Sequence, residues 1–189
     1  MVGDKKAVAC IEDTAVALED LPSYIKEFTA IMKSYNQEVV YYAHAGAGEL
    51  HLRPILNLKT KEGVSYFRSI TTDVAHLVKK YKGSFSGEHG DGIVRSEFIP
   101  IVIGEKNYAL LSVVKKAFDP NYIFNPGKIT APLKMDVSLR NDYKQDPPKI
   151  DTAFNFDDSQ GIDTPNAVKS VETKEFGPRL GVNSRFIQK

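Results

Sequence analysis

Three stretches of the chain carry apolar residues at the three- and four-residue spacing of an amphipathic helix. The first covers about 20–35, where Asp20 can cap the helix and a proline falls in its first turn. The second covers about 62–81 and the third about 105–118, which ends before Asp119-Pro120 because proline cannot continue a helix. The apolar positions of the third helix are Leu110, Leu111, Val114 and Phe118.

Three shorter stretches have the pattern of β-strands. Residues 6–12 form a short apolar run that predicts a buried strand, and 39–43 form an apolar, aromatic run typical of an interior strand. Residues 49–56 alternate, which predicts that one face of the strand is polar. Because only the glycine-containing segment 45–48 separates the last two strands, we expect a hairpin. The polar face of its second strand would carry Glu49, His51 and Arg53.

The order of these elements predicts an α+β fold in which helices pack on one face of an antiparallel sheet. After about residue 131 the periodicity ends, and prolines and polar residues punctuate the chain. We therefore expect a folded domain at 1–131 and, at 132–189, a tail that is extended or partly disordered.

Composition excludes several classes of protein. The net charge of the 189 residues is +1 and no block of Lys or Arg stands out, so nucleic-acid binding is not indicated. A single cysteine, Cys10, allows no disulfide within the chain and no cysteine-ligated iron–sulfur cluster. The apolar stretch near the N-terminus is too short for a signal peptide or a membrane span. These features lead us to expect a cytoplasmic protein without a transmembrane segment.

Three of the four histidines lie in two glycine-rich segments, at 44–51 and 86–92. In the predicted hairpin, a tight turn would bring His44 and His51 together, and Glu88 from the second segment would add a carboxylate. Two histidines and one carboxylate are a recurrent ligand set for a catalytic divalent ion.

Two other interpretations stand beside the metal site. A single histidine near an apolar strand is more often structural than a ligand, although that explains a Glu-His pair between glycines poorly. Gly46 and Gly48 could also cradle a phosphate, but the segment lacks both the Gly-Lys-Ser/Thr ending and the strand–loop–helix order of such loops.

Three ordered motifs, at 44–51, 86–92 and 118–128, together resemble the C-terminal domain of FAD-linked oxidases. This family, within the vanillyl-alcohol oxidase superfamily, includes the flavoprotein subunit of glycolate oxidase, D-lactate dehydrogenase and D-2-hydroxyglutarate dehydrogenase. The segments 12–16, 51–59 and 92–96 most resemble its large bacterial branch, in which an iron–sulfur module follows the flavoprotein. The resemblance implies a ferredoxin-like cap domain, here incomplete.

The resemblance also implies roles for individual residues. His44, His51 and Glu88 match the family's ligands for a divalent metal, Zn or Mn, and His89 matches its active-site base. The segment that lies near the flavin is matched by Asn125, Pro126, Gly127 and Lys128.

The chain also departs from several relatives, with Ala47 where they carry Asp and Arg53 where they carry Asn. A planar guanidinium suits a substrate carboxylate, so we expect Arg53 to bind substrate, with a surface ion pair as the alternative. Arg95 is a second candidate for substrate binding, with support of the loop through Asp91 as its alternative.

Such a protein would oxidise a D-2-hydroxy acid to the 2-oxo acid. The resemblance implies that FAD is held by an N-terminal domain or partner subunit absent from this chain, so we expect no turnover by the chain alone. An iron–sulfur module is a further expected partner. The alternatives are a non-catalytic metal- or partner-binding remnant and a metal-dependent hydrolase.

Overall fold

The computed structural model describes residues 4–140 and 143–144, and the elements below are those of this part of the chain. Short 3-10 helices also occur at Leu18–Asp20, Ala45–Ala47 and Ser96–Phe98. The strands and α-helices, in chain order, are β1 Lys6–Ala7, β2 Thr14–Ala15, α1 Leu21–Ser34, β3 Val39–His44, β4 Glu49–Leu56, α2 Lys61–Lys80, α3 Ile99–Ile103 and α4 Glu105–Phe118.

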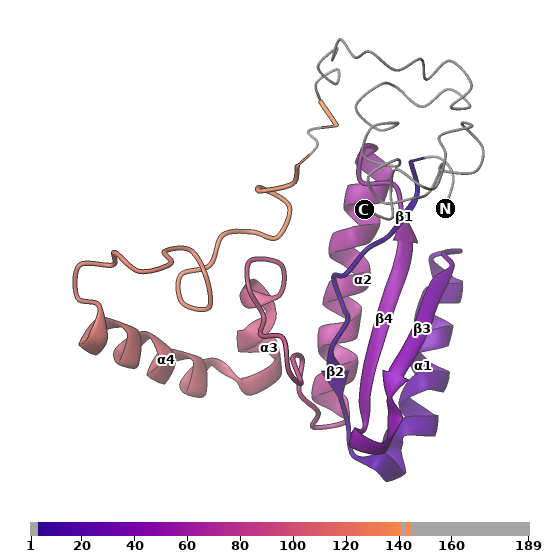
Figure 1. The fold of residues 1–189 in the computed structure, drawn as a ribbon, viewed down its shortest axis with the longest axis horizontal. Helices are drawn as coiled ribbons and strands as arrows, with labels where there is room; N and C mark the ends of the chain where they lie inside the picture. The colour runs from indigo at the N-terminus through magenta and orange to yellow at the C-terminus, as the bar shows by residue number, and fades with distance from the viewer. Residues whose placement is uncertain (1–3, 141–142, 145–189) are drawn as a thin grey trace, which may run out of the picture.

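The sheet is built around β4, the longest strand. It pairs with β3 along one edge and with β1 and β2 along the other, and every pairing is antiparallel. The β3–β4 register runs from His44 opposite Glu49 to Val39 opposite Pro54, so the predicted hairpin is confirmed. Figure 1 shows the strands as one layer and α1 with α2 as a second layer along one face of the sheet. The predicted α+β architecture is therefore confirmed.

The core lies between the sheet and these two helices. Alternate residues of β4, among them Leu50 and Leu52, point into it, because successive side chains of a strand face opposite sides. The opposite face of β4 carries the polar residues of the strand. The largest fully buried side chains that α1 and α2 contribute to the core are Tyr24, Phe28, Met32, Phe67, Ile70, Val74 and Val78.

The prediction of one continuous strand at 6–12 is wrong. The chain leaves the sheet after Val8, whose amide donates to Pro54, and rejoins it at Asp13, whose amide donates to Leu50. Asp13 has a φ of +75°, which a continuous strand of L-residues does not adopt. The apolar residues between the two short strands, including the fully buried Cys10, enter the core from irregular backbone.

The prediction of an interior strand at 39–43 is also wrong. Among the described residues β3 pairs only with β4, and Val40, Tyr41 and Tyr42 are exposed. The two tyrosine rings still pack, Tyr41 edge-on against Phe28 of α1 and Tyr42 on the opposite face of the sheet. An apolar, aromatic run therefore does not distinguish an interior strand from an edge strand.

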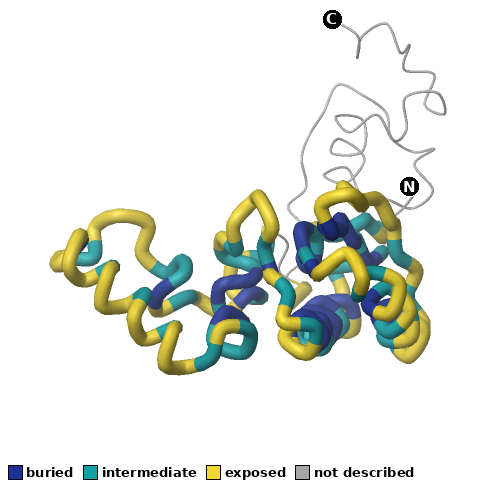
Figure 2. The backbone as a smooth tube through the Cα atoms, turned by 90° about the horizontal axis from the view of Figure 1, so that it is seen from below, coloured by how far each residue is buried: buried dark blue, intermediate teal, exposed yellow. Residues whose placement is uncertain are grey.

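Helix α4 forms where the third helical pattern lies, but it buries none of its residues. Figures 1 and 2 show α4 apart from the sheet, and its packing within the chain is mainly against α3. Leu110 is 61% exposed and Phe118 is 86% exposed. We call α4 and the loop that follows it to residue 131 the arm, and residues 4–98 the body. Within the described residues, no helix is both long enough and apolar enough to cross a membrane.

The predicted tail lies mostly outside the described residues. Its first residues are described to Arg140 and contain no helix or strand. Met135 is buried, and Asp136 pairs with Arg68 of α2 at 2.8 Å. The domain boundary at 131 and the state of the tail stay predictions.

Candidate functional site

The hairpin places Tyr42, His44 and His51 on the face of the sheet opposite the helices. Tyr42 lies directly opposite His51 in the register, and their rings stack with centroids 4.7 Å apart. The rings of His44 and His51 meet edge to face at 5.1 Å. The turn depends on Gly48, whose φ is +72° and where a Cβ would lie 2.1 Å from the Val16 carbonyl oxygen.

A second segment, 86–89, covers this face and brings Glu88 to the histidines. Glu88 Oε1 lies 3.8 Å from Nε2 of both His44 and His51. It lies 2.9 Å from Nε2 of His89, whose ring stacks on His51 at 5.5 Å. The structure therefore brings together the four residues that the sequence singled out, and we call them the histidine cluster.

The donor atoms of the histidine cluster fit a divalent cation. One ligand atom each of His44, His51 and Glu88 lies within 4.8 Å of the others. Bonds of about 2.1 Å to a tetrahedral ion place ligand atoms about 3.4 Å apart. The spacing of 3.8 Å to Glu88 then requires shifts of only a few tenths of an ångström. Two imidazoles and a carboxylate suit Zn²⁺ or a similar ion, but the role of these residues as ligands stays a prediction.

The cluster has one buried side and one open side. The His51 side chain is 4% exposed, whereas those of His44 and Glu88 are 61% and 46% exposed. The buried His51 imidazole stacks with the rings of Tyr42 and His89, which fixes its orientation, while His44 and Glu88 are open to solvent. This arrangement is typical of a binding site and unlike that of histidines packed in a core.

A second group of acidic residues, Asp13, Glu49 and Glu88, also lies within 4.8 Å, but Asp13 is not free to bind an ion. Its carboxylate already accepts hydrogen bonds from Ser86 Oγ and from two backbone amides of the loop. Burial would raise the pKa of Asp13, but its hydrogen bonds, from Ser86 and Glu49 first, outweigh burial and hold that pKa below its usual range. The hydrogen bond to Asp13, with burial, raises the pKa of Glu49.

Arg53 lies at the edge of the cluster, on the same face as His51. Its Nε donates to Glu12 Oε2 at 2.5 Å, and its guanidinium lies over the ring of Tyr42, 5.2 Å from the centroid. Glu12 Oε1 is also 3.7 Å from His89 Nδ1. The structure thus contains the ion pair that was the alternative for Arg53, and its contact with a substrate carboxylate stays a prediction.

Arg95 is buried behind the loop. Its guanidinium donates to the carbonyl oxygens of Glu12 and Gly90, and it lies 3.4 Å from Asp13 Oδ2 and 3.8 Å from Asp91 Oδ1. Arg95 is only 5% exposed, so its guanidinium contacts other groups of the protein and not solvent. These contacts favour support of the loop, the alternative role, and substrate binding by Arg95 stays a prediction.

The predicted flavin-contacting residues lie on the arm, and Figure 1 shows this part of the chain well away from the β3–β4 turn. Asn125 and Gly127 have φ values of +46° and +76°, and Lys128 Nζ lies 3.2 Å from Asn125 Oδ1. The structure does not bring Asn125, Pro126, Gly127 or Lys128 together with the histidine cluster. Their role near a flavin stays a prediction.

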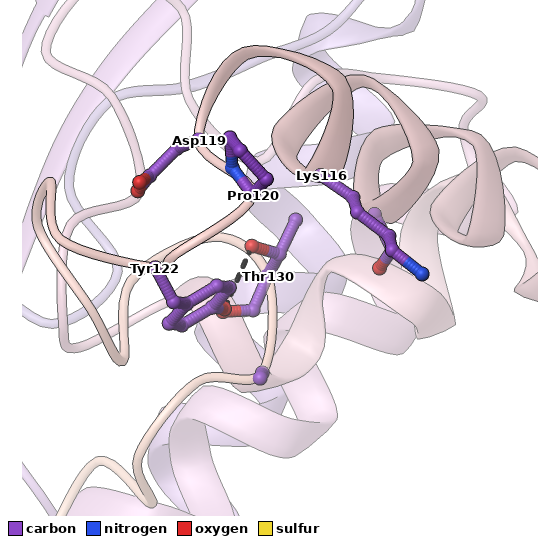
Figure 3. A pocket seen from close by; sticks show the side chains of 7 residues that line it. Lys116, Asp119, Pro120, Tyr122 and Thr130 are labelled. Atoms are coloured by element: carbon purple, nitrogen blue, oxygen red, sulfur yellow. Dashed lines mark hydrogen bonds between the residues drawn. The ribbon is translucent and has the colours of Figure 1, made fainter.

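The loop that follows α4 in the arm borders a hollow of about 300 Å³ at the end of this helix, shown in Figure 3. Tyr122, which lines it, donates to the Thr130 carbonyl oxygen at 2.6 Å. Asp119 beside it is engaged by Lys115 and by two backbone amides of the loop. These contacts fix the shape of the loop, and the hollow is separate from the histidine cluster.

Sequence reasoning assigned no role to Tyr42, Glu12 or Asp13, although all three touch the cluster. A signal for two of them exists in the sequence, because Glu12 and Asp13 directly follow an apolar run and buried carboxylates require partners. Their partners in the loop, more than seventy residues later, follow only from the tertiary structure.

Comparison of the sequence with known families assigns the chain to one of them. Residues 1–129 match the family described as FAD linked oxidases, C-terminal domain. The chain therefore belongs to the family of C-terminal domains of FAD-linked oxidases, and the family is one that uses FAD.

The chain is also similar to individual proteins of this family. The chain is 42% identical over 131 residues to D-2-hydroxyglutarate dehydrogenase of Haemophilus influenzae, a match that covers 69% of the chain and 13% of that protein. It is 39% identical over 137 residues to the enzyme of the same name from Escherichia coli, covering 72% and 13%. A more distant relative, glycolate oxidase subunit GlcD of Bacillus subtilis, is 25% identical over 126 residues, covering 67% and 27%. The chain thus spans 13% of the length of the first two relatives.

Proposed function

We propose that this chain is the substrate- and metal-binding portion of an FAD-dependent dehydrogenase that oxidises a D-2-hydroxy acid to the 2-oxo acid. The observation that carries the proposal is the histidine cluster, in which two imidazoles and a carboxylate converge beside a further histidine. D-2-Hydroxyglutarate is the first substrate to test, because the relatives at 42% and 39% identity carry that name.

His44, His51 and Glu88 would hold a divalent ion, Zn²⁺ or Mn²⁺, with positions left open for the substrate. Bound there, the ion would supply Lewis-acid stabilisation of the substrate oxygen as negative charge develops on it. His51 provides the rigid part of this site because its ring is buried and stacks with the rings of Tyr42 and His89.

In this reaction the substrate loses its hydroxyl proton and the hydride on C2, and a carbonyl forms at C2. FAD, reduced by the hydride, supplies the redox chemistry. His89 would accept the proton. Its Nε2 lies 2.9 Å from Glu88 Oε1, and this nitrogen is free to act as the base once Glu88 turns to the ion, while Nδ1 faces Glu12. The His89 side chain is 48% exposed, so a substrate on the open side of the cluster can reach it.

Arg53 is the proposed partner of the substrate carboxylate. It lies on the same face of the sheet as His51, and its pairing with Glu12 and Tyr42 orients the guanidinium. A planar group with several N–H donors suits a carboxylate ligand. The cation and Arg53 together favour an anionic substrate.

The arm is the proposed surface for the flavin-binding domain or subunit. Its exposed apolar residues lie on α4 and on the loop that carries Asn125 to Lys128. Apolar groups gathered on one exposed element mark a surface for another protein. We propose that the chain is inactive without this partner, that an iron–sulfur module is a further partner, and that the protein is cytoplasmic.

The test is reconstitution with a flavin-binding polypeptide, chosen first from the reading frames adjacent to this one. We expect reduction of an electron-accepting dye with D-2-hydroxyglutarate or D-lactate only when chain, partner and metal are combined. His89→Ala should lower kcat by roughly 10²–10⁴-fold, the usual contribution of a general base. The matched control is His76→Ala, since His76 is an exposed histidine of α2 outside the cluster.

Two results would contradict the proposal. Turnover at the wild-type rate in His89→Ala would show that His89 is not the base. A flavin-loaded partner that binds the chain but gives no turnover with any 2-hydroxy acid would favour the non-catalytic remnant.

A further inference from the structure

Asp13 has a left-handed backbone conformation, which is uncommon for residues other than glycine. It lies between β1 and β2, is fully buried, and has a φ of +75°, a left-handed conformation that costs energy for a residue with a Cβ. Such a conformation persists where the surrounding structure over-determines it, and an observed outlier of this kind is a pointer to function. The contacts of Asp13 show what holds it there.

One residue, Asp13, binds four consecutive residues of the loop above the hairpin. Its carboxylate accepts from Ser86 Oγ at 2.6 Å, from the Glu88 amide at 2.7 Å and from the His89 amide at 2.9 Å. Its carbonyl oxygen accepts from the Gly87 amide at 2.6 Å. The proposed metal ligand and the proposed base are therefore anchored, through their own backbone, on a single side chain.

Two neighbours make this contact possible. Gly87 admits the carboxylate, because a Cβ at that position would lie only 3.2 Å from Asp13 Oδ1 and from the Glu49 carboxyl carbon. Arg95, itself buried, places its guanidinium 3.4 Å from Asp13 Oδ2 and donates to the carbonyl oxygen of Gly90. Asp13 therefore holds residues 86–89, and Arg95 links it to Gly90 at the end of this loop.

Asp13 is distinct from the residues that would touch the metal or the substrate. Both of its carboxylate oxygens are already used by the loop, so it cannot also bind an ion without releasing Glu88 and His89. Charge-assisted hydrogen bonds of a carboxylate to backbone N–H groups are stronger than those between neutral groups. A change at Asp13 therefore acts on the site through the loop.

We infer that Asp13 is a positioning residue, which fixes the 86–89 loop so that Glu88 faces His44 and His51 while His89 stacks on the His51 ring. The inference rests on the proposed function for the meaning of that geometry. Groups that orient metal ligands typically contribute 10–100-fold to metal affinity, although they do not touch the metal.

The experiment compares Asp13→Asn with wild type by calorimetric titration with Zn²⁺ and by the visible absorption of bound Co²⁺. Asparagine tolerates the left-handed backbone and keeps one acceptor oxygen, but its NH₂ would face a donor of the loop. We expect Zn²⁺ affinity to fall by about 10–100-fold, with an altered Co²⁺ spectrum. Asp73→Asn is the matched control, since Asp73 accepts a hydrogen bond from Tyr35, the residue after α1, and lies outside the cluster.

A merely structural role would lower the urea midpoint of Asp13→Asn without changing metal affinity or the Co²⁺ spectrum, and that result would overturn the inference. If Asp13→Asn does not fold, Ser86→Ala removes one contact of Asp13 alone. It should weaken Zn²⁺ binding several-fold, and unchanged affinity would count against the inference.

Hydrogen exchange separates this inference from the proposed function. The amides of Glu88 and His89 should be protected in the metal-free wild type and lose protection in Asp13→Asn. Wild type that fails to bind Zn²⁺ but shows this loss would contradict the metal site and keep the positioning role. Zn²⁺ binding that is lost in Glu88→Gln but intact in Asp13→Asn would support the metal site and contradict the positioning role.

Discussion

Helices α2 and α4 have the same kind of apolar spacing in the sequence, yet their environments are opposite. Nine residues of α2 are buried, and none of α4 is. Thr60 caps the start of α2, where its side chain accepts from the Gly63 amide, whereas Gly104 precedes α4 and provides no side-chain cap. Most helical stability in proteins comes from packing of the apolar face, so α2 is self-sufficient within the chain and α4 is not.

The difference divides the proposed chemistry between two regions. The body holds the histidine cluster on a sheet braced by α1 and α2, which gives the fixed geometry that metal binding and proton transfer require. The arm offers apolar side chains and the Asn125–Lys128 loop to another protein. In this account the body can bind metal alone, and the arm makes the redox reaction possible only when a partner covers it.

The largest expected effect is a difference in unfolding free energy between substitutions of two phenylalanines. Phe67 of α2 is 2% exposed and Phe118 of α4 is 86% exposed. Phe67→Ala should cost about 3–5 kcal/mol of unfolding free energy, because it removes a core side chain and leaves a cavity. Phe118→Ala should change it by no more than about 0.5 kcal/mol. Urea unfolding measures both, and similar costs would show that α4 is packed in solution.

The same arm substitution should matter once the partner is present. Phe118→Ala is expected to weaken binding of the flavin-binding polypeptide by about 1–2 kcal/mol, roughly 5- to 30-fold, if the side chain is buried at the centre of the interface. Val40→Ala is the control, because Val40 is an exposed apolar residue of β3 in the body. Calorimetry of the two variants would refute the division of roles if Val40→Ala weakened binding and Phe118→Ala did not.

The cap of α2 gives a smaller effect. Thr60→Ala should lower the unfolding free energy by about 1 kcal/mol, since the Gly63 amide loses its partner at the start of the helix. Thr60→Ser keeps the hydroxyl and should cost little. Equal midpoints of Thr60→Ala and wild type in urea would show that the cap is replaced by water.

The smallest expected effect is a change with pH in the stability that Asp119 of the loop after α4 contributes. A hydrogen bond from Lys115 lowers the pKa of Asp119 below its ordinary value, so the carboxylate stabilises the fold above that ordinary value. This contribution is lost as the pH falls through the lowered pKa of the folded state. The difference in thermal midpoint between wild type and Asp119→Asn should therefore be largest near neutrality and shrink in acid. A difference that grows in acid would have the wrong sign.

Features set by nearby residues could be predicted from the sequence. The hairpin followed from two strand patterns around a glycine turn, and that turn was enough to bring His44 and His51 together. The approach of Glu88 followed from its place in a second glycine-rich segment and from the resemblance to a family. Local chemistry and spacing therefore predicted the hairpin and the three longer helices, and together with the resemblance they predicted the members of the cluster.

Features set by distant contacts could not be predicted in this way. The strand expected at 6–12 is broken because Asp13 turns to meet a loop more than seventy residues later. The edge position of β3 depends on which strands pair, and the exposure of α4 depends on which surfaces meet. Apolar spacing shows that a helix has a face to bury, but it does not identify what covers that face.

The central claim is that His44, His51 and Glu88 share one divalent ion, and X-ray absorption spectroscopy of the Zn²⁺-loaded chain tests it most directly. We predict two imidazole ligands together with oxygen ligands in wild type. His44→Ala, chosen because that side chain is 61% exposed, should leave one imidazole and an otherwise folded protein. A spectrum without imidazole ligands, or one that His44→Ala leaves unchanged, would contradict the claim.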